Sequence, residues 1–408
     1  MRRLDAALED RSNCKGGVEP PHSKVPSAQR WPWGNNMATE WILMPSLIMA
    51  FVIVVCLVLY YLMPRMTRPE VYFAVTVPSE FRDSAEGWSI LKRYRVEVVI
   101  FSVLALIVIL APAQTGESTY ALALTLAGFF LQGAGVFFAY YRARRQVLPH
   151  AVAPVTVREA ALEPRPTRLP GGWLLQFPPL ALLAGTGIWL QTHWEQIPAT
   201  FPVHWGANGK PNNWSTRTSA GVYWPLLMGV VLCVFMGFLA YAFLRWSRPV
   251  QVAGPRGDRE RSFRKMVGSI LVAVQYLLSL QFTWVGLMPL SHPQAGPPGV
   301  VPILVIALGF VVVVAVLVMR YGQGGTRLAG AAASALGGVA PVGDRTPDKY
   351  WKLGLFYVNR DDPAVFIEKR FGVGYTVNFG HPGVWIGLAV LVAVTVAIAL
   401  LAPSQHHP

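Results

Sequence analysis

Long apolar stretches whose interiors carry no charged residue alternate with shorter polar segments along most of this chain. A helix needs about 20 apolar residues to cross a bilayer core of roughly 30 Å, because no water is present there to satisfy an open backbone. Eight stretches meet or approach that requirement: 42–63, 96–112, 120–141, 173–190, 221–244, 268–290, 300–319 and 384–401. The pattern predicts an all-α polytopic membrane protein with about eight transmembrane helices, the fourth kinked by Pro178 and Pro179.

The interiors of these stretches contain few polar side chains and no ionisable ones from the five common types. They lack Asp, Glu, Lys, Arg and His, and their deepest polar residues are Gln132, Gln275 and Gln281. We expect these amides to bond neighbouring helices; the alternative is that they line the polar pathway of a transporter. No nucleophile with a base, no H-E-x-x-H, no G-x-S-x-G and no Walker loop occurs. We therefore expect no enzyme, no catalytic residue, no bound metal and no cofactor.

Basic residues divide the connections between the stretches into two classes. The chain has 35 Lys and Arg against 21 Asp and Glu, a formal charge of +14. Of the basic residues, 27 lie in the four connections 64–95, 142–172, 245–267 and 320–383, and only two lie in the remaining connections and the tail. Cytoplasmic loops carry the excess of Lys and Arg, so the loop 191–220 is predicted outside. The charge therefore reflects topology and does not indicate nucleic-acid binding.

Residues 1–36 disagree with this orientation, because they carry six basic residues on the side that should have few. The segment is rich in polar residues and proline and has no apolar periodicity, so we expect it to be disordered. We expect Met37 to be the natural start of the chain.

The outer loop 191–220 has an unusual composition for a connector. It contains two histidines, three tryptophans and the turn signal Asn208-Gly209. We expect a compact cap with a short strand over 203–205 and a second turn at 212–213. His204 is expected to bond the backbone of the loop. The alternatives are a metal site with His193 and Glu195, and recognition of an external peptide or ligand.

The stretch I-P-A-T-F-P-V-H-W-G-A-N-G-K-P-N-N-W-S-T-R resembles the bacterial membrane family called domain of unknown function 1648, a module also found in the SdpI-type toxin-immunity proteins. The matching positions are Pro202, His204, Gly209, Pro211 and Trp214. The departures are Asn212 for the usual Asp, Asn213 for Gly, and Arg217 for Lys.

A second informative segment, 344–382, follows a Gly- and Ala-rich linker, 321–343. Apolar residues alternate at 353, 355 and 357 and again at 373, 375 and 377, with turn signals between them. The pattern predicts a small extended, β-like cytoplasmic module between the last two helices. Alternation at 71, 73, 75 and 77 predicts another strand, in the first basic connection.

The module resembles the small domain of unknown function 5808. The positions that fit its pattern are Trp351, Lys352, Gly354, Tyr357, Asn359, Asp362, Pro363, Lys369, Arg370, Gly372, Gly374, Thr376, Asn378 and Phe379. The apolar spans, the composition and the two resemblances divide the chain into seven regions: a disordered segment 1–36, the first three helices in 37–172, an SdpI-like module in 173–244, two helices in 245–320, the linker 321–343, the module 344–382, and the last helix and tail in 383–408.

The best-understood relatives implied by these resemblances protect a bacterium from a secreted peptide toxin and signal to a cytoplasmic repressor. We therefore expect an immunity or signal-transducing protein of the bacterial cytoplasmic membrane, with an external peptide and a cytoplasmic regulator as partners beside the bilayer. The alternatives are a transporter and a structural membrane protein without a ligand. The candidate binding residues are His204, Asn208, Gly209, Pro211, Asn212, Trp214, Trp351, Tyr357, Lys369 and Arg370. For Lys369 and Arg370 the alternative is an ordinary positive-inside charge.

Overall fold

The computed structural model describes residues 36–115, 120–153, 169–205, 211–248, 255–291, 300–328 and 346–401. Within these ranges, seven helices are long and apolar enough to cross a membrane, and an eighth has a shorter apolar stretch. The helices are α1 (Asn36–Met66), α2 (Ala85–Thr115), α3 (Ala121–Val147), α4 (Phe177–Thr192), α5 (Ser219–Trp246), α6 (Pro255–Ser291), α7 (Val300–Tyr321) and α8 (Pro382–Leu401). The predicted fold class, an all-α polytopic membrane protein, is confirmed. Residues 1–35, for which disorder is predicted, lie outside the described ranges.

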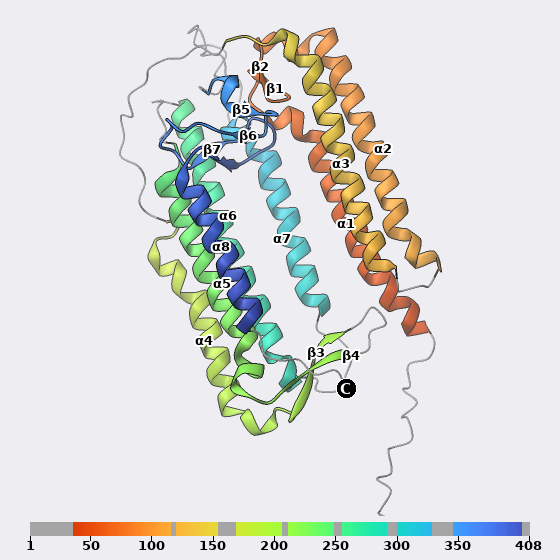
Figure 1. The fold of residues 1–408 in the computed structure, drawn as a ribbon, viewed down its shortest axis with the longest axis vertical. Helices are drawn as coiled ribbons and strands as arrows, with labels where there is room; N and C mark the ends of the chain where they lie inside the picture. Colours follow the sequence, from red (N-terminus) through yellow and green to blue (C-terminus); the bar gives the residue numbers. More distant parts are fainter. Residues whose placement is uncertain are drawn as a thin grey trace, which may run out of the picture.

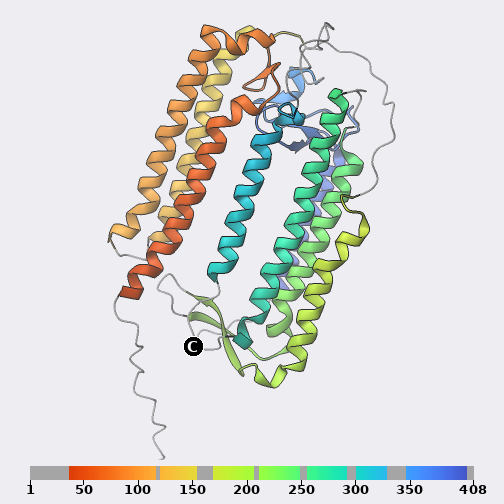
Figure 2. The same cartoon turned by 180° about the vertical axis from the view of Figure 1, so that it is seen from behind.

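The helices form two bundles. Helices α1, α2 and α3 pack together as the first bundle, and α4, α5 and α6 form the second. Helix α7 stands between them and contacts α1 and α6 (Figures 1 and 2). Each bundle is therefore built from helices that follow one another in the sequence.

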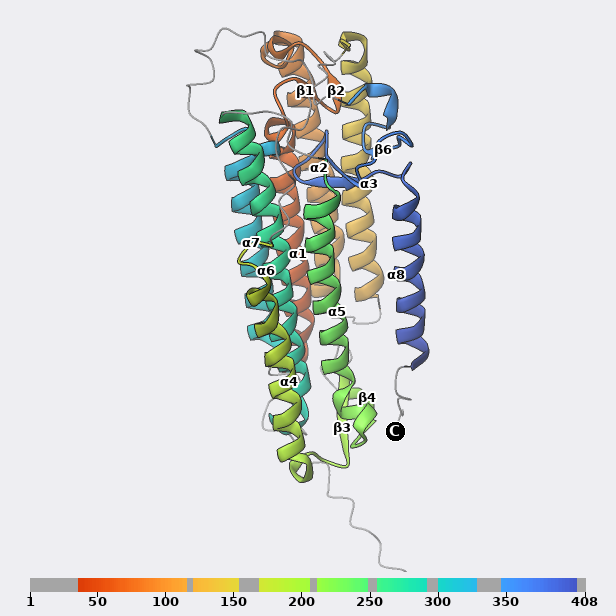
Figure 3. The same cartoon turned by 90° about the vertical axis from the view of Figure 1, so that its left-hand side faces the viewer.

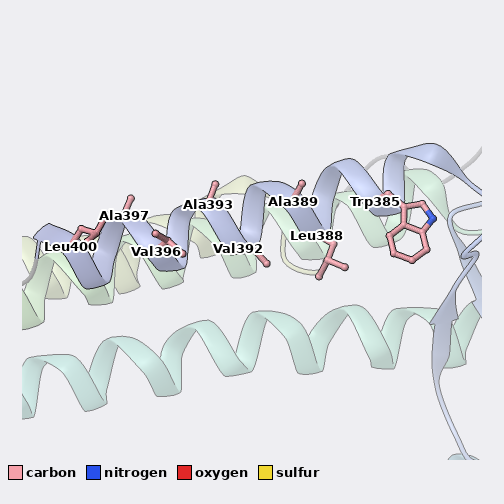
Figure 4. A pocket seen from close by; sticks show the side chains of 8 residues that line it. All are labelled: Trp385, Leu388, Ala389, Val392, Ala393, Val396, Ala397 and Leu400. Atoms are coloured by element: carbon pink, nitrogen blue, oxygen red, sulfur yellow. The ribbon is translucent and has the colours of Figure 1, made fainter.

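Helix α8 lies at the edge of the molecule (Figure 3). Its side chains are exposed along almost its whole length. The face that runs from Trp385 to Leu400 is an open apolar surface whose side chains all belong to α8 (Figure 4). A helix that is apolar on all sides is stable in hydrocarbon, so lipid chains can cover this face in a bilayer.

Consecutive helices run in opposite directions, so their ends gather at two sides of the molecule (Figure 1). One side, the hairpin end, carries strands β3 (Thr200–Trp205) and β4 (Pro211–Thr216). The other side, the module end, carries residues 346–381, which we call the module. The helix ends that flank all four basic connections lie at the module end.

In the described ranges the strands form four antiparallel pairs. Besides β3–β4, they are β1 (Val71–Tyr72) with β2 (Val75–Thr76), β5 (Trp351–Lys352) with β6 (Phe356–Tyr357), and β7 (Phe366–Glu368) with β8 (Tyr375–Val377). The last two pairs agree with the short strands predicted in the module.

Several local predictions are wrong. Pro178 and Pro179 occupy the first turn of α4 and do not kink it, because a helix needs no backbone N–H there. The continuous strand predicted over 71–77 is a hairpin in which Phe73 and Ala74 have positive φ and turn the chain. Leu353, at φ 53°, turns the chain between β5 and β6 in the same way. The turn predicted at 212–213 lies inside β4.

The first residues of the predicted linker are folded. A 3-10 turn, η5 (Gln323–Gly325), follows α7. The buried Gln323 side chain accepts from the Gly374 N–H at 2.7 Å and donates to the Gly374 carbonyl at 3.0 Å. This amide therefore fixes the end of α7 to the module. Residues 329–345 of the predicted linker and module lie outside the described ranges.

Candidate functional site

The β3–β4 hairpin has a buried base and an exposed edge. Phe201 is buried and packs in one apolar cluster with Ile197 and Val222, so the base of the hairpin is continuous with the second bundle. The register places Pro202 opposite Trp214 and His204 opposite Asn213, with an irregularity on each side of His204. Irregular pairing of this kind redirects side chains, and the His204 side chain is exposed.

Arg217 closes the hairpin onto the turn that follows α4. Its Nη1 donates to the carbonyls of Trp194 and Ile197, both at 3.2 Å, and pairs with Glu195 at 3.1 Å. Its backbone N–H donates to the Ala199 carbonyl at 2.9 Å. The position where the family usually has Lys therefore holds an arginine whose several donors fix both sides of the hairpin base.

The hairpin continues directly into α5. Thr218 is the N-cap, and its hydroxyl accepts from the Gly221 N–H at 3.1 Å. A side chain at Gly221 would overlap the Thr216 carbonyl of β4, so this glycine permits the close approach of strand and helix. The start of α5 is thus rigidly joined to the hairpin.

The candidate residues of the hairpin differ in their surroundings. Trp214 is partly exposed, but its indole nitrogen is buried and has no hydrogen-bond acceptor among the described residues. Asn208 and Gly209 lie outside the described ranges, and the side chains of Pro211 and Asn212 are not described either.

The three residues considered for a metal site do not converge. His193 stacks on Trp189 at 4.0 Å, with its Nδ1 2.9 Å from the Trp189 carbonyl, and Glu195 pairs with Arg217. In the described part of the chain no three His, Cys, Asp or Glu side chains are grouped so that they could hold a metal ion.

Helix α5 connects the hairpin to the module. Its 28 residues span about 42 Å. At its far end, the Trp246 carbonyl accepts from the Val365 N–H at 2.9 Å, and the Arg248 N–H donates to the Phe366 carbonyl at 3.2 Å. The Arg248 guanidinium also forms an ion pair with Asp362 of the module. Main-chain and side-chain contacts therefore join the end of α5 to β7.

Three of the four candidate residues in the module are interior. Trp351 and Tyr357 belong to its apolar core. Arg370 is fully buried: its Nη1 donates to Asp348 at 2.6 Å, its Nη2 donates to the Thr346 carbonyl, and it lies over the Trp351 ring. Burial raises the pKa of the Tyr357 phenol, which donates to Asp362 at 3.0 Å. These side chains stabilise the module, whereas the neighbouring Lys369 is exposed.

The first bundle holds the opposite side of the module. The Thr76 hydroxyl of β2 donates to Asp348 at 2.8 Å, and the Tyr140 phenol of α3 donates to the Leu353 carbonyl at 2.9 Å. Phe371 stacks on Phe73 of the β1–β2 hairpin, with ring centroids 5.8 Å apart. The module thus contacts both bundles.

The sequence reasoning missed a charged cavity at this junction. The cavity has a volume of about 30 Å³, enough for water, and its walls include Arg68, Arg248, Glu260, Arg264 and Glu368. These residues come from the connections after α1 and α5, from α6 and from the module. Arg68 pairs with Glu368, and the Arg264 guanidinium donates to the Arg248 carbonyl. The count of basic residues located these arginines at one side of the molecule, but it contained no signal for their partners.

Comparisons with known proteins identify both segments. A domain of unknown function (DUF1648) matches residues 180–229, and a family of unknown function (DUF5808) matches residues 360–385. The first match includes most of α4, the hairpin and the start of α5; the second includes β7, β8 and the start of α8. No curated protein and no solved structure matches the chain. The predicted resemblance is confirmed: the chain carries a DUF1648 match over most of α4, the hairpin and the start of α5, and a DUF5808 match follows it toward the C-terminus.

Proposed function

We propose that this protein is an SdpI-like immunity and signal-transducing protein of the bacterial cytoplasmic membrane. The β3–β4 hairpin binds an external peptide or envelope component, and the module binds a cytoplasmic regulator. One observation carries the proposal: α5 is capped by the hairpin at one end and hydrogen-bonded to the module at the other. A displacement of the hairpin base therefore reaches the module through one continuous helix.

The distribution of charge supports this orientation. All four basic connections begin at the module end, and the positive-inside rule assigns that end to the cytoplasm. The connection 191–220, which contains the hairpin, has only two basic residues, Lys210 and Arg217, and is then assigned to the outside.

The hairpin suits recognition and not catalysis, so we propose a binding protein that is no enzyme. Its exposed edge presents His204. An extended peptide can add a strand to such an edge, where main-chain hydrogen bonds supply affinity and side-chain contacts supply specificity.

The polar residues at depth favour a receptor over a transporter. Gln132 donates to the Ile53 carbonyl at 3.1 Å and to Ser102 at 3.0 Å inside the first bundle. Gln275 is buried in the second bundle, and Gln281 is exposed on the surface of α6. The three amides therefore do not line one common pathway.

The test is a sensitivity screen of a deletion strain against secreted peptide toxins and envelope stress. We expect the deletion to raise sensitivity and the wild-type gene to restore resistance. His204→Ala, at the hairpin, and Asp362→Asn, at the joint between α5 and the module, are expected to restore little or none of it, because one impairs recognition and the other weakens the Arg248 ion pair.

Two matched variants control for general damage. Gln196→Ala changes an exposed residue beside the hairpin, and Asp361→Asn changes the exposed neighbour of Asp362. Both are expected to behave like wild type, with equal amounts of all variants in the membrane by immunoblot. Unchanged sensitivity of the deletion strain across the screen would contradict the proposal.

A further inference from the structure

A groove of about 540 Å³ lies beside α2 at the module end of the first bundle. One wall is Tyr61 of α1, and the other is the face of α2 that runs from Trp88 to Ile100. On α2 the lining positions are 88, 89, 91, 92, 95, 96, 99 and 100, a spacing that places them along one face of a helix. The groove therefore runs along the helix, from the membrane boundary toward the bilayer centre.

The two ends of the groove differ in chemistry. Lys92 and Arg95 lie at the end nearer the module, and Val96, Val99 and Ile100 continue toward the bilayer centre. The Val96 and Ile100 side chains are each 50% exposed, because no other part of the described chain covers them. From Lys92 to Ile100 the helix rises about 12 Å, which separates a cationic end from an apolar end.

Aromatic side chains hold the cationic end in place. The Arg95 Nε donates to the Tyr61 carbonyl at 3.3 Å, and its guanidinium lies over the Tyr61 ring at 4.3 Å. The Arg65 guanidinium lies over Trp88 at 4.4 Å and adds a third positive charge beside the groove. No lining residue is acidic, and neither Lys92 nor Arg95 has an acidic partner among the described residues.

We propose that this groove is a binding site for a phospholipid with an anionic headgroup. The phosphate contacts Lys92 and Arg95, and an acyl chain lies along Val96, Val99 and Ile100. Tryptophan and tyrosine side chains favour the level of the lipid headgroups and glycerol backbones. Basic pockets between transmembrane helices on the cytoplasmic side, to which the proposed orientation assigns the module end, bind anionic headgroups. A free phosphate would leave the apolar half of the groove uncovered, so the occupant is a lipid.

The test compares lipid adducts by native mass spectrometry. The full chain is reconstituted in phosphatidylcholine nanodiscs that contain a minor fraction of phosphatidylglycerol, and is then released for measurement. Lys92→Gln/Arg95→Gln is expected to reduce the preference for phosphatidylglycerol about thirtyfold, because each cation near the surface contributes roughly fivefold. The control, Arg93→Gln/Lys265→Gln, removes two exposed charges at the same end that do not line the groove, and should retain the preference. Equal preference in wild type and both double variants would overturn the proposal.

A second measurement needs no variant and decides the question if the double variant does not fold. A phosphatidylglycerol with a diazirine in its acyl chain is cross-linked to the wild-type protein in the same nanodiscs. Labelling concentrated in the peptide that contains 96–100, and reduced by excess unlabelled phosphatidylglycerol but not by phosphatidylcholine, supports the site. Labelling spread equally over all helices would overturn it.

Discussion

Replacing Arg370 by alanine is expected to destabilise the module strongly. The change removes a fully buried guanidinium that pairs with Asp348, donates to the Thr346 carbonyl and covers the Trp351 ring. Breaking a buried ion pair by removing one partner costs about 3–5 kcal/mol. Because the Asp348 side chain is 29% exposed and stays partly solvated, we expect the lower end of that range, about 3 kcal/mol.

Pulse proteolysis in detergent, across a urea series, measures this loss as a shift in the midpoint of cleavage within the module. Lys369→Ala is the matched control, since it removes the neighbouring cation, which is exposed. It is expected to leave the midpoint nearly unchanged. The same midpoint for both variants would show that the buried ion pair does not stabilise the module.

Replacing Gly354 by valine is expected to separate the module from the first bundle. Gly354 has φ +74°, and a Cβ there would lie 2.5 Å from the Tyr140 hydroxyl and 2.7 Å from both the Ala74 Cβ and the Arg144 Nη1. All three neighbours belong to the first bundle or its β1–β2 hairpin. The left-handed backbone alone costs about 1–2 kcal/mol in a residue with a Cβ, and the overlaps add to that.

Labelling of a single cysteine reports this separation. Thr76 is buried and its side chain contacts Asp348 of the module, so Thr76→Cys, in a chain whose native cysteines are replaced, is expected to resist a maleimide. In the Gly354→Val background it is expected to be labelled. Gly172→Val is the control, because Gly172 has φ +71° but no atom within 4 Å of the added Cβ. Equal labelling in both glycine variants would assign the effect to backbone strain and not to the docking surface.

The membrane helices could be predicted from the sequence because hydrocarbon imposes one requirement on every residue of a span. The helix boundaries were harder to predict, because α2 and α6 begin with charged residues, which an apolar pattern does not assign to a membrane helix. Alternation also misled at Phe73, Ala74 and Leu353, where non-glycine residues at positive φ turn the chain. Such turns are held by distant contacts, such as the Tyr140 bond to the Leu353 carbonyl, which a linear pattern does not contain.

The candidate site, too, could be predicted only in part. The motif located the hairpin and the module, but it could not distinguish interior from surface residues. Arg370 and Lys369 are adjacent cations in the sequence, yet one is buried against Asp348 and the other is exposed. Gln323 was assigned to a linker, although its amide holds Gly374. Each of these roles depends on a partner that is distant in the sequence, and only the fold brings the partners together.

The opposite placement of the hairpin and the module across the bilayer is tested most directly by cysteine labelling. In a chain whose three native cysteines are replaced, single cysteines at the exposed positions Gln196 and Asp361 are treated with a membrane-impermeant maleimide. The account predicts that Gln196→Cys is labelled on intact cells and that Asp361→Cys is labelled only after the membrane is permeabilised. Labelling of both positions on intact cells, or of Asp361→Cys alone, would contradict it.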